Sequence, residues 1–134
     1  MRISKLTLMG IVLLVSLTCA GVVSACEYGC SPGYWKNHDW PAGTIPFPAN
    51  IDLNNDGAWD TPIDALNYQG GPGVEGAQRI FLKAYVAGYL NYLSGFGVSS
   101  VALFDGTYNS QNRQVLITKA GILDHWNNIG CPWD

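Results

Sequence analysis

The sequence predicts a mainly α-helical domain, because two long segments have a helical pattern and the remainder is rich in turns. Residues 26–73 contain six of the seven prolines and several glycines. Since proline interrupts helices and central strands, this half is expected to be irregular, with short helical turns. We therefore expect two principal helices packed on a proline-, glycine- and aromatic-rich N-terminal half, with a disulfide between the ends of the domain.

The first principal helix is predicted over residues 73–94, where apolar residues cover most of the circumference. Polar residues recur every four positions and mark one solvent-facing stripe: Glu75, Arg79 and Lys83. Gly95 and Gly97 are expected to end the helix. Gly88 costs about 1 kcal/mol relative to alanine in a helix interior, so we expect it to mark a close crossing with another element.

The second principal helix is predicted over residues 110–130, after a short helical turn and a loop at 98–110. Asn109 or Ser110 can cap its start, and Gly130 with Pro132 can end it. One face carries the residues expected to enter the core: Leu116, Ala120, Leu123 and either Trp126 or Asn127.

Residues 1–25 have the pattern of a secretory signal peptide, with a basic start, an apolar run and small residues at the end. The apolar run is too short for a membrane span, although an uncleaved N-terminal anchor is an alternative. We therefore expect residues 1–25 to be removed and residues 26–134 to form a single extracellular domain.

The charge of the mature chain argues against a nucleic-acid partner. The chain has seven basic and ten acidic residues and a net charge of −3. The signal peptide removes Arg2 and Lys5, so five basic residues face ten acidic ones and the net charge becomes about −5. An acidic chain does not suit a phosphate backbone, so a surface protein or a glycan is the expected partner.

Three of the four cysteines remain after signal cleavage, which is an odd number. A bridge between Cys30 and Cys131 would link the ends of the domain and stabilise it by roughly 4–5 kcal/mol in the chain-entropy model. The alternatives are pairing of Cys26 with Cys131, or Cys26 bridging two chains. Residues 23–26 also resemble a bacterial lipobox, so lipid on Cys26 is the one expected link to a membrane.

The segment DLNNDGAWD, residues 52–60, has the spacing of a calcium-binding loop. Oxygen-bearing side chains occupy positions one, three, five and nine: Asp52, Asn54, Asp56 and Asp60. Gly57 stands sixth, where such a loop turns sharply, and the carbonyl of Ala58 at position seven would point inward. Because Ca²⁺ takes six to eight oxygen ligands, this spacing predicts a Ca²⁺ site.

This loop resembles the D-x-D-x-D-G-x-x-D calcium loops of integrin-type propellers and, more loosely, those of dockerins and EF-hands. The acid that EF-hands and dockerins carry at position twelve is Ile63 here, and Asp64 follows one residue later. Asp64 is therefore an additional candidate ligand. The alternative is a turn rich in Asp and Asn that binds no ion, because these residues also favour turns for their own reasons.

An active site built on histidine is the main enzymatic alternative. His38 and His125 each neighbour an aspartate in the sequence, and a histidine oriented by a carboxylate can act as a general base. The chain has no Gly-x-Ser-x-Gly elbow. A small extracellular hydrolase using either histidine thus remains the enzymatic alternative. Zinc held by Cys30, Cys131 and the two histidines is not expected, because their spacing is unlike that of zinc loops.

The five tryptophans allow a carbohydrate-binding module as a further alternative, if some of their rings are exposed. In a domain of this size, however, large aromatic rings are needed for the core. We expect Tyr34 and Trp35 to enter the core between the helices. The following residues are expected to donate hydrogen bonds to backbone carbonyls: Lys36, Asn37 and His38.

Three segments resemble a family of small secreted proteins of bacteria and archaea: residues 31–41, 79–95 and 122–132. The family opens with a Cys-(Ser/Thr)-Pro-Gly-Tyr-Trp-Lys-Asn-His signature, matched after Cys30 by Gly33, Tyr34, Trp35, Lys36, Asn37 and His38. The resemblance implies an exported domain held by its terminal cysteines and implies no activity. The sequence therefore predicts a secreted or surface-attached, non-catalytic module stabilised by Ca²⁺.

Overall fold

The computed structural model describes residues 28–95 and 99–133. Residues 1–25 and Cys26 lie outside these ranges, so the signal peptide and the lipidation of Cys26 stay predictions. The elements follow in the order α2 (Pro32–Trp35), α3 (Pro62–Leu66), α4 (Gly73–Leu93), η2 (Ser99–Phe104), η3 (Thr107–Asn109) and α5 (Arg113–Asn127). The prediction of a mainly α fold is confirmed, with no strand in the part of the chain that is described.

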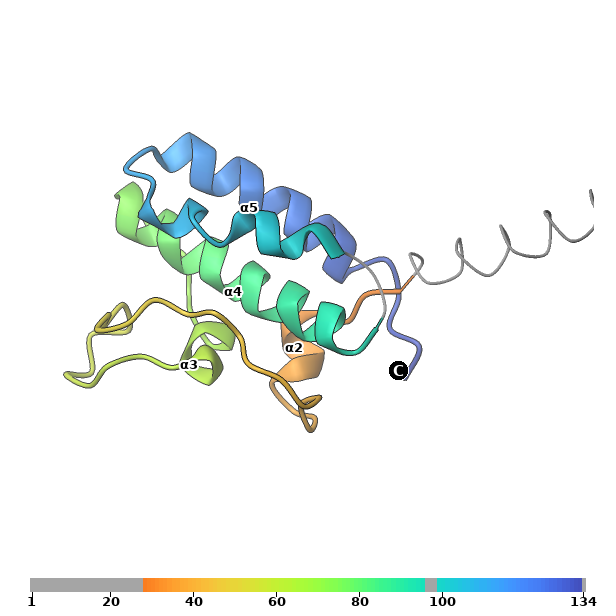
Figure 1. Ribbon diagram of the computed structural model, residues 1–134. Helices are drawn as coiled ribbons and strands as arrows, with labels where there is room; N and C mark the ends of the chain where they lie inside the picture. The colour runs from red at the N-terminus through yellow and green to blue at the C-terminus, as the bar shows by residue number, and fades with distance from the viewer. Residues whose placement is uncertain (1–27, 96–98, 134) are drawn as a thin grey trace, which may run out of the picture.

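Helices α4 and α5 lie side by side and run in the same direction, because η2 and η3 return the chain to the start of α4 (Figure 1). At one end, Arg113 Nη1 donates to the carbonyl oxygen of Gly73 at 2.6 Å. At the other end, Asn91 Nδ2 donates to Asn127 Oδ1 at 3.0 Å. Polar contacts therefore set the register of the pair at both ends.

The close crossing expected at Gly88 is present. A Cβ atom there would lie 3.3 Å from both Leu123 Cδ2 and Val101 Cγ2. Such a distance is tighter than ordinary van der Waals contact, so a larger residue would push α5 and η2 away from α4. The glycine penalty within α4 is thus offset by closer packing of its neighbours.

Helix α5 begins later than the sequence pattern indicated. Its cap is Asn112, whose Oδ1 accepts the N–H groups of Gln114 and Val115, whereas Asn109 and Ser110 were expected to cap it. Asn109 instead ends η3, and Ser110 Oγ accepts the N–H of Asn112. The buried residues of α5 are Leu116, Ala120, Leu123 and Asn127. Of the two alternatives for the last core position, Asn127 is therefore the buried residue, and Trp126 is half-buried.

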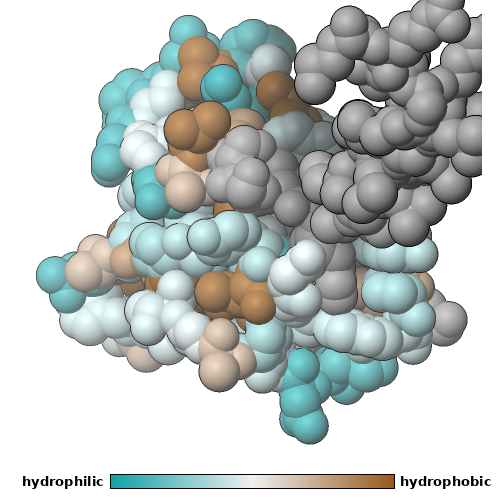
Figure 2. All heavy atoms as spheres, turned by 45° about the vertical axis from the view of Figure 1, so that its right-hand side comes forward, coloured by the Kyte–Doolittle hydropathy of each residue, from teal (hydrophilic) through white to brown (hydrophobic). Residues whose placement is uncertain are grey.

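The N-terminal half is irregular apart from α2 and α3, and it lies along one side of α4 (Figure 1). Trp35 at the end of α2 is 1% exposed and forms part of the core. Tyr34 enters the core only in part, because its half-buried ring stacks on exposed His38 with centroids 3.8 Å apart. On the face drawn in Figure 2, strongly hydrophobic residues form separate patches among polar ones.

The ends of the described domain meet at the predicted disulfide. Cys30 and Cys131 are bonded, with their Cα atoms 4.4 Å apart. Next to this bond, the N–H of Gly29 donates to the carbonyl oxygen of Gly130 at 3.0 Å. A Cβ atom on Gly29 would collide with the carbonyl of Trp126, so this approach requires glycine. The disulfide thus joins α2 to the end of α5.

Asn91, which is 2% exposed on α4, connects the disulfide, the buried tryptophan and α5. Its Oδ1 accepts the N–H of Cys30 at 2.8 Å and Trp35 Nε1 at 3.1 Å. Its Nδ2 donates to the carbonyl oxygen of Cys30 and to Asn127 Oδ1, both at 3.0 Å. Asn127 Nδ2 then donates to the carbonyl oxygen of Ala84 at 2.9 Å. One buried amide therefore satisfies polar groups of Cys30, Trp35 and Asn127.

We expect Asn91→Ala to lower the free energy of unfolding by about 3–5 kcal/mol, because it leaves several buried donors and acceptors without partners at once. Asn128→Ala is the matched control, since Asn128 is exposed and its side chain donates, within the described residues, to neighbouring Asp124 alone. Its cost should be below about 1 kcal/mol. Urea unfolding of the oxidised protein measures both values. Equal losses in the two variants would contradict the role assigned to Asn91.

Candidate metal centre

The loop Asp52–Asp60 is closed by hydrogen bonds within the loop and across its ends. The N–H of Asp60 donates to the carbonyl oxygen of Ile51 at 2.7 Å. The carboxylate of Asp52 accepts the N–H of Asp56 at 3.1 Å and that of Gly57 at 3.0 Å. Gly57 has a φ of +85°, so the sharp turn expected at the sixth position is present.

Three carboxylates of this loop converge. Asp52, Asp56 and Asp60 each place one carboxylate oxygen within 4.8 Å of the other two, an arrangement that could hold a metal ion. Negative charges at such distances repel one another unless a cation or a proton compensates them. Three of the six predicted ligands therefore lie close enough together to share one metal ion.

Asp60 is the buried member of the group, with 8% of its surface exposed. Its Oδ2 accepts the N–H of Leu53 and the hydroxyl of Tyr68, both at 2.6 Å. Its Oδ1 is buried without a hydrogen-bond partner, and no other buried side-chain oxygen or nitrogen of the described residues shares this condition. A buried carboxylate oxygen without a partner is costly, and a bound cation would remove that cost.

The other predicted ligands have different positions. Asn54 Oδ1 accepts the N–H of Asp56 at 3.0 Å, so the amide lies within the loop. Ala58 contributes its N–H to Asp56 Oδ1 at 2.9 Å. Asp64 is not part of the converging group, because its Oδ2 accepts the N–H and the hydroxyl of Thr61 at the start of α3. The Asp64 carboxylate is thereby engaged in capping that helix.

Two residues outside the loop position it, and sequence spacing did not indicate either of them. Tyr68, just after α3, donates its hydroxyl to Asp60. Arg79 on α4 donates from Nη1 to the carbonyl oxygen of Leu53 at 3.0 Å and to Glu75 at 2.8 Å. The loop is thus connected to both flanking helices by side chains whose roles depend on tertiary contacts.

The Tyr68 hydroxyl is held in its protonated, hydrogen-bond-donating form. Burial raises the pKa of Tyr68, and the hydrogen bond to Asp60 and the negative charges of Asp60 and Asp64 raise it further. Tyr85 on α4 follows the same rule, because burial and its hydrogen bond to Asp105 raise its pKa. Both hydroxyls therefore remain donors at neutral pH.

The histidines have surface positions. His38 is exposed, with Nδ1 2.8 Å from the carbonyl oxygen of Tyr34, and exposed His125 lies in the last turn of α5. Within the described residues, neither histidine makes a hydrogen bond to an aspartate. The sulfurs of Cys30 and Cys131 are joined in the disulfide, so they offer no thiolate for zinc.

Of the opening signature, Asn37 behaves as expected and donates to the carbonyl oxygen of Gly33 at 3.0 Å, while Lys36 is exposed. Two tryptophan side chains have more than half of their surface exposed: Trp59 in the loop Asp52–Asp60 and Trp133 near the C-terminus. The Trp133 ring packs against Tyr34 and Trp35, with centroids 6.2 and 6.0 Å away. The exposed tryptophans therefore belong to two separate parts of the chain.

Comparison with protein-family models, curated proteins and solved structures finds no match to this chain. The resemblance of its three segments to small secreted proteins therefore stays a prediction.

We expect the free energy of unfolding to fall as the pH rises above about 10, the ordinary pKa of tyrosine. The unfolded chain then loses protons that folded Tyr68 and Tyr85 retain, because their pKa values are raised in the folded state. Urea unfolding across alkaline pH, with ultraviolet titration of tyrosine, measures the effect. Tyr68→Phe should make the fall shallower, and an unchanged slope in that variant would contradict the contribution of Tyr68.

Proposed function

We propose that this chain is a secreted or surface-attached, non-catalytic module whose fold is stabilised by Ca²⁺ bound in the loop Asp52–Asp60. The observation that carries this proposal is the buried Oδ1 of Asp60, which has no hydrogen-bond partner. The carboxylate of Asp60 also lies close to those of Asp52 and Asp56. A cation shared by the three carboxylates would neutralise their repulsion and give Oδ1 a partner.

The donor set favours Ca²⁺ over the other common metal ions. All the expected donors are oxygens, whereas zinc prefers sulfur and nitrogen. Magnesium requires near-ideal octahedral geometry and gives up its water reluctantly, while calcium accepts six to eight ligands at flexible angles. Asn54 Oδ1, the carbonyl of Ala58 and water would complete the shell around the three carboxylates.

A bound ion would stabilise more than the loop. Leu53 connects the site to α4, since its N–H donates to Asp60 and its carbonyl accepts from Arg79. Tyr68 connects the same carboxylate to the segment after α3. Ca²⁺ in this loop would therefore hold the irregular N-terminal half against the principal helices. Extracellular modules bind Ca²⁺ with dissociation constants of about 10⁻⁴–10⁻³ M, which suits a compartment where calcium is millimolar.

Export is supported by the signal-like pattern of residues 1–25 and by the disulfide, which persists in oxidising compartments. Among the described helices, none is long and apolar enough to cross a membrane. We propose lipid at Cys26 as the means of surface attachment. The intact mass of the mature protein would show whether the chain begins at Cys26 and whether that residue carries lipid.

A non-catalytic role is supported by the surroundings of the histidines. A general base needs a substrate within hydrogen-bond reach, which an enclosing pocket usually secures. His38 stacks on Tyr34 at the surface, and His125 is exposed at the end of α5. The hydrolase alternative would be favoured by an activity that His38→Ala or His125→Ala removes without lowering the melting temperature.

We expect Ca²⁺ at about 10 to 100 times its dissociation constant to raise the melting temperature by roughly 6–15 °C, because an ion that binds only the folded state stabilises it. Asp60→Asn and Asp56→Ala should remove most of this shift. Asp124→Asn, an exposed aspartate on α5, is the matched control and should retain it. Differential scanning calorimetry with Ca²⁺, with Mg²⁺ and with a chelator makes the comparison.

Terbium luminescence provides a second measurement that does not depend on stability. Trp59 lies within the loop and is 65% exposed, so its excitation should sensitise Tb³⁺ bound to the three carboxylates. Ca²⁺ should displace Tb³⁺ and quench the signal, and Trp59→Phe should weaken it. No calcium-dependent shift in melting together with no loop-dependent terbium signal would refute the proposal.

A further inference from the structure

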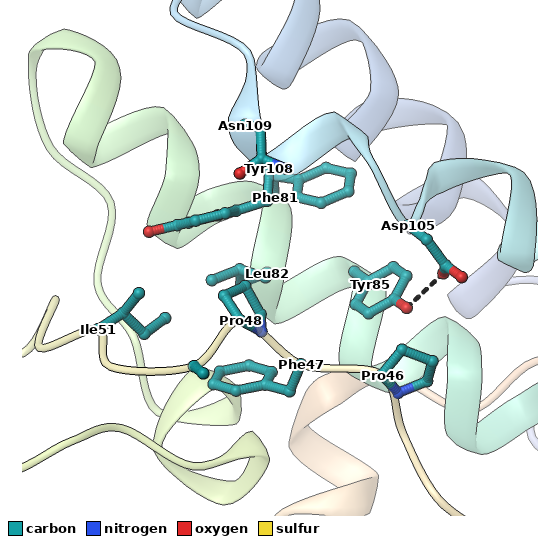
Figure 3. A pocket seen from close by; sticks show the side chains of 11 residues that line it. Pro46, Phe47, Pro48, Ile51, Phe81, Leu82, Tyr85, Asp105, Tyr108 and Asn109 are labelled. Atoms are coloured by element: carbon teal, nitrogen blue, oxygen red, sulfur yellow. Dashed lines mark hydrogen bonds between the residues drawn. The ribbon is translucent and has the colours of Figure 1, made fainter.

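A pocket of about 350 Å³ lies over α4, between residues 46–51 and residues 105–109 (Figure 3). It is separate from the three converging carboxylates, none of which lines it. Its volume falls within the range of small-molecule sites. The chain thus contains a second candidate binding site on the same helix.

Aromatic rings form much of this pocket. Phe81 and Tyr85, which are 1% and 2% exposed, lie on α4. Phe47 comes from the irregular segment and Tyr108 from η3, and both rings are half-buried (Figure 3). Because Phe47 and Tyr108 keep part of their surface open, a ligand in the pocket can contact aromatic rings supplied by two separate segments.

The pocket carries a negative charge and no positive one. Asp105 is exposed and is the single charged residue among those that line it. The hydroxyl of Tyr85 donates to Asp105 Oδ1 at 2.5 Å, which orients the carboxylate (Figure 3). Burial raises the pKa of Tyr108, and the negative charges of Asp60 and Glu75 raise it further, so its hydroxyl stays protonated. The whole chain has a net charge of −3, which also favours a cation.

We propose that this pocket binds an organic cation bearing a methylated ammonium group, with Phe47 and Tyr108 contacting the methyl groups and Asp105 balancing the charge. The negative faces of aromatic rings attract cations, and quaternary ammonium groups are recognised in this way. The remaining lining is mostly proline and aliphatic, which suits methyl groups. A primary ammonium is strongly hydrated and would lose more hydration than this lining can replace.

This proposal does not rest on the proposed calcium site, and both can be tested in the same sample. Ile51 lines the pocket, and in the sequence it directly precedes the loop Asp52–Asp60. The measurements are therefore made with saturating Ca²⁺ and again with a chelator. Failure of calcium to bind would appear in the melting temperature and in the terbium signal. Failure of the organic cation to bind would leave the calcium-dependent melting temperature and the terbium signal unchanged.

The probe is choline, titrated into the oxidised mature protein and followed by isothermal calorimetry and by NMR of the aromatic ring signals. Three comparison ligands have defined roles. The neutral carbon isostere of choline tests the charge, the amide of Nα-acetyl-lysine tests a primary ammonium, and glucose tests a neutral sugar. We expect choline to bind most tightly and to shift the ring signals of Tyr108 and Phe47.

Two variants locate the site. Asp105→Asn keeps an oxygen for the Tyr85 hydroxyl and removes the charge, so choline affinity should fall about fivefold. Tyr108→Leu retains apolar volume and removes the ring, so affinity should fall roughly 2- to 30-fold. Asp39→Asn, an exposed aspartate that does not line the pocket, is the control and should bind as the unaltered protein does. The melting temperature of each variant shows whether it remains folded.

Four outcomes would overturn the proposal. The first is equal or tighter binding of the carbon isostere, which would mean that charge is not recognised. The second is tighter binding of the lysine amide, and the third is binding of glucose with none of choline. The fourth is the absence of ring shifts with choline in a folded protein. Tightest binding of choline, weakened in both pocket variants and unchanged in the control, supports it.

Discussion

The fold depends on one buried amide, that of Asn91. Its four hydrogen bonds satisfy both backbone groups of Cys30, the indole of Trp35 and the amide oxygen of Asn127. The backbone of an irregular segment has no helix to satisfy its polar groups, so buried side chains must do so. Asn91 does this at the point where the disulfide joins the chain ends, which gives α2, α4 and α5 one common reference.

From that reference, α4 serves as the scaffold for both candidate sites. On one part of it, Arg79 holds the backbone of Leu53 and so positions the loop that carries the three carboxylates. On another part, Phe81 and Tyr85 contribute to the aromatic pocket, and Tyr85 orients Asp105. A helix that is buried over most of its surface can position groups accurately, because its own side chains have little freedom. The irregular half supplies the loops, and α4 determines where they lie.

The two candidate sites differ in the burial and the surroundings of their carboxylates. In the loop Asp52–Asp60, Asp60 is buried and lies close to two further carboxylates, which is why we propose a compact inorganic cation there. In the pocket, Asp105 is exposed and aromatic rings form much of the lining, which is why we propose a larger and weakly hydrated cation there. Within the described residues the one ion pair joins Arg79 and Glu75, so no basic side chain pairs with a carboxylate of either region. Cation recognition is what the proposals for these two regions have in common.

The amino-acid sequence by itself determined the two principal helical segments, the pairing of Cys30 with Cys131 as the leading choice, and the run of oxygen-bearing side chains in residues 52–60. These features depend on local spacing, on proline and glycine, or on residue types with few alternatives. Only the tertiary structure decided that buried Asn91 bonds to Cys30, Trp35 and Asn127. It also decided that Tyr68 and Arg79 position the loop Asp52–Asp60. The aromatic pocket likewise brings together residues that are distant in the sequence: Phe47, Tyr85, Asp105 and Tyr108. The tertiary structure also showed that Asn112, and neither Asn109 nor Ser110, caps α5, and that the carboxylate of Asp64 accepts a hydrogen bond from Thr61. The physical reason is that these contacts join residues far apart in the chain or depend on competing local hydrogen bonds, and sequence periodicity contains neither kind of information.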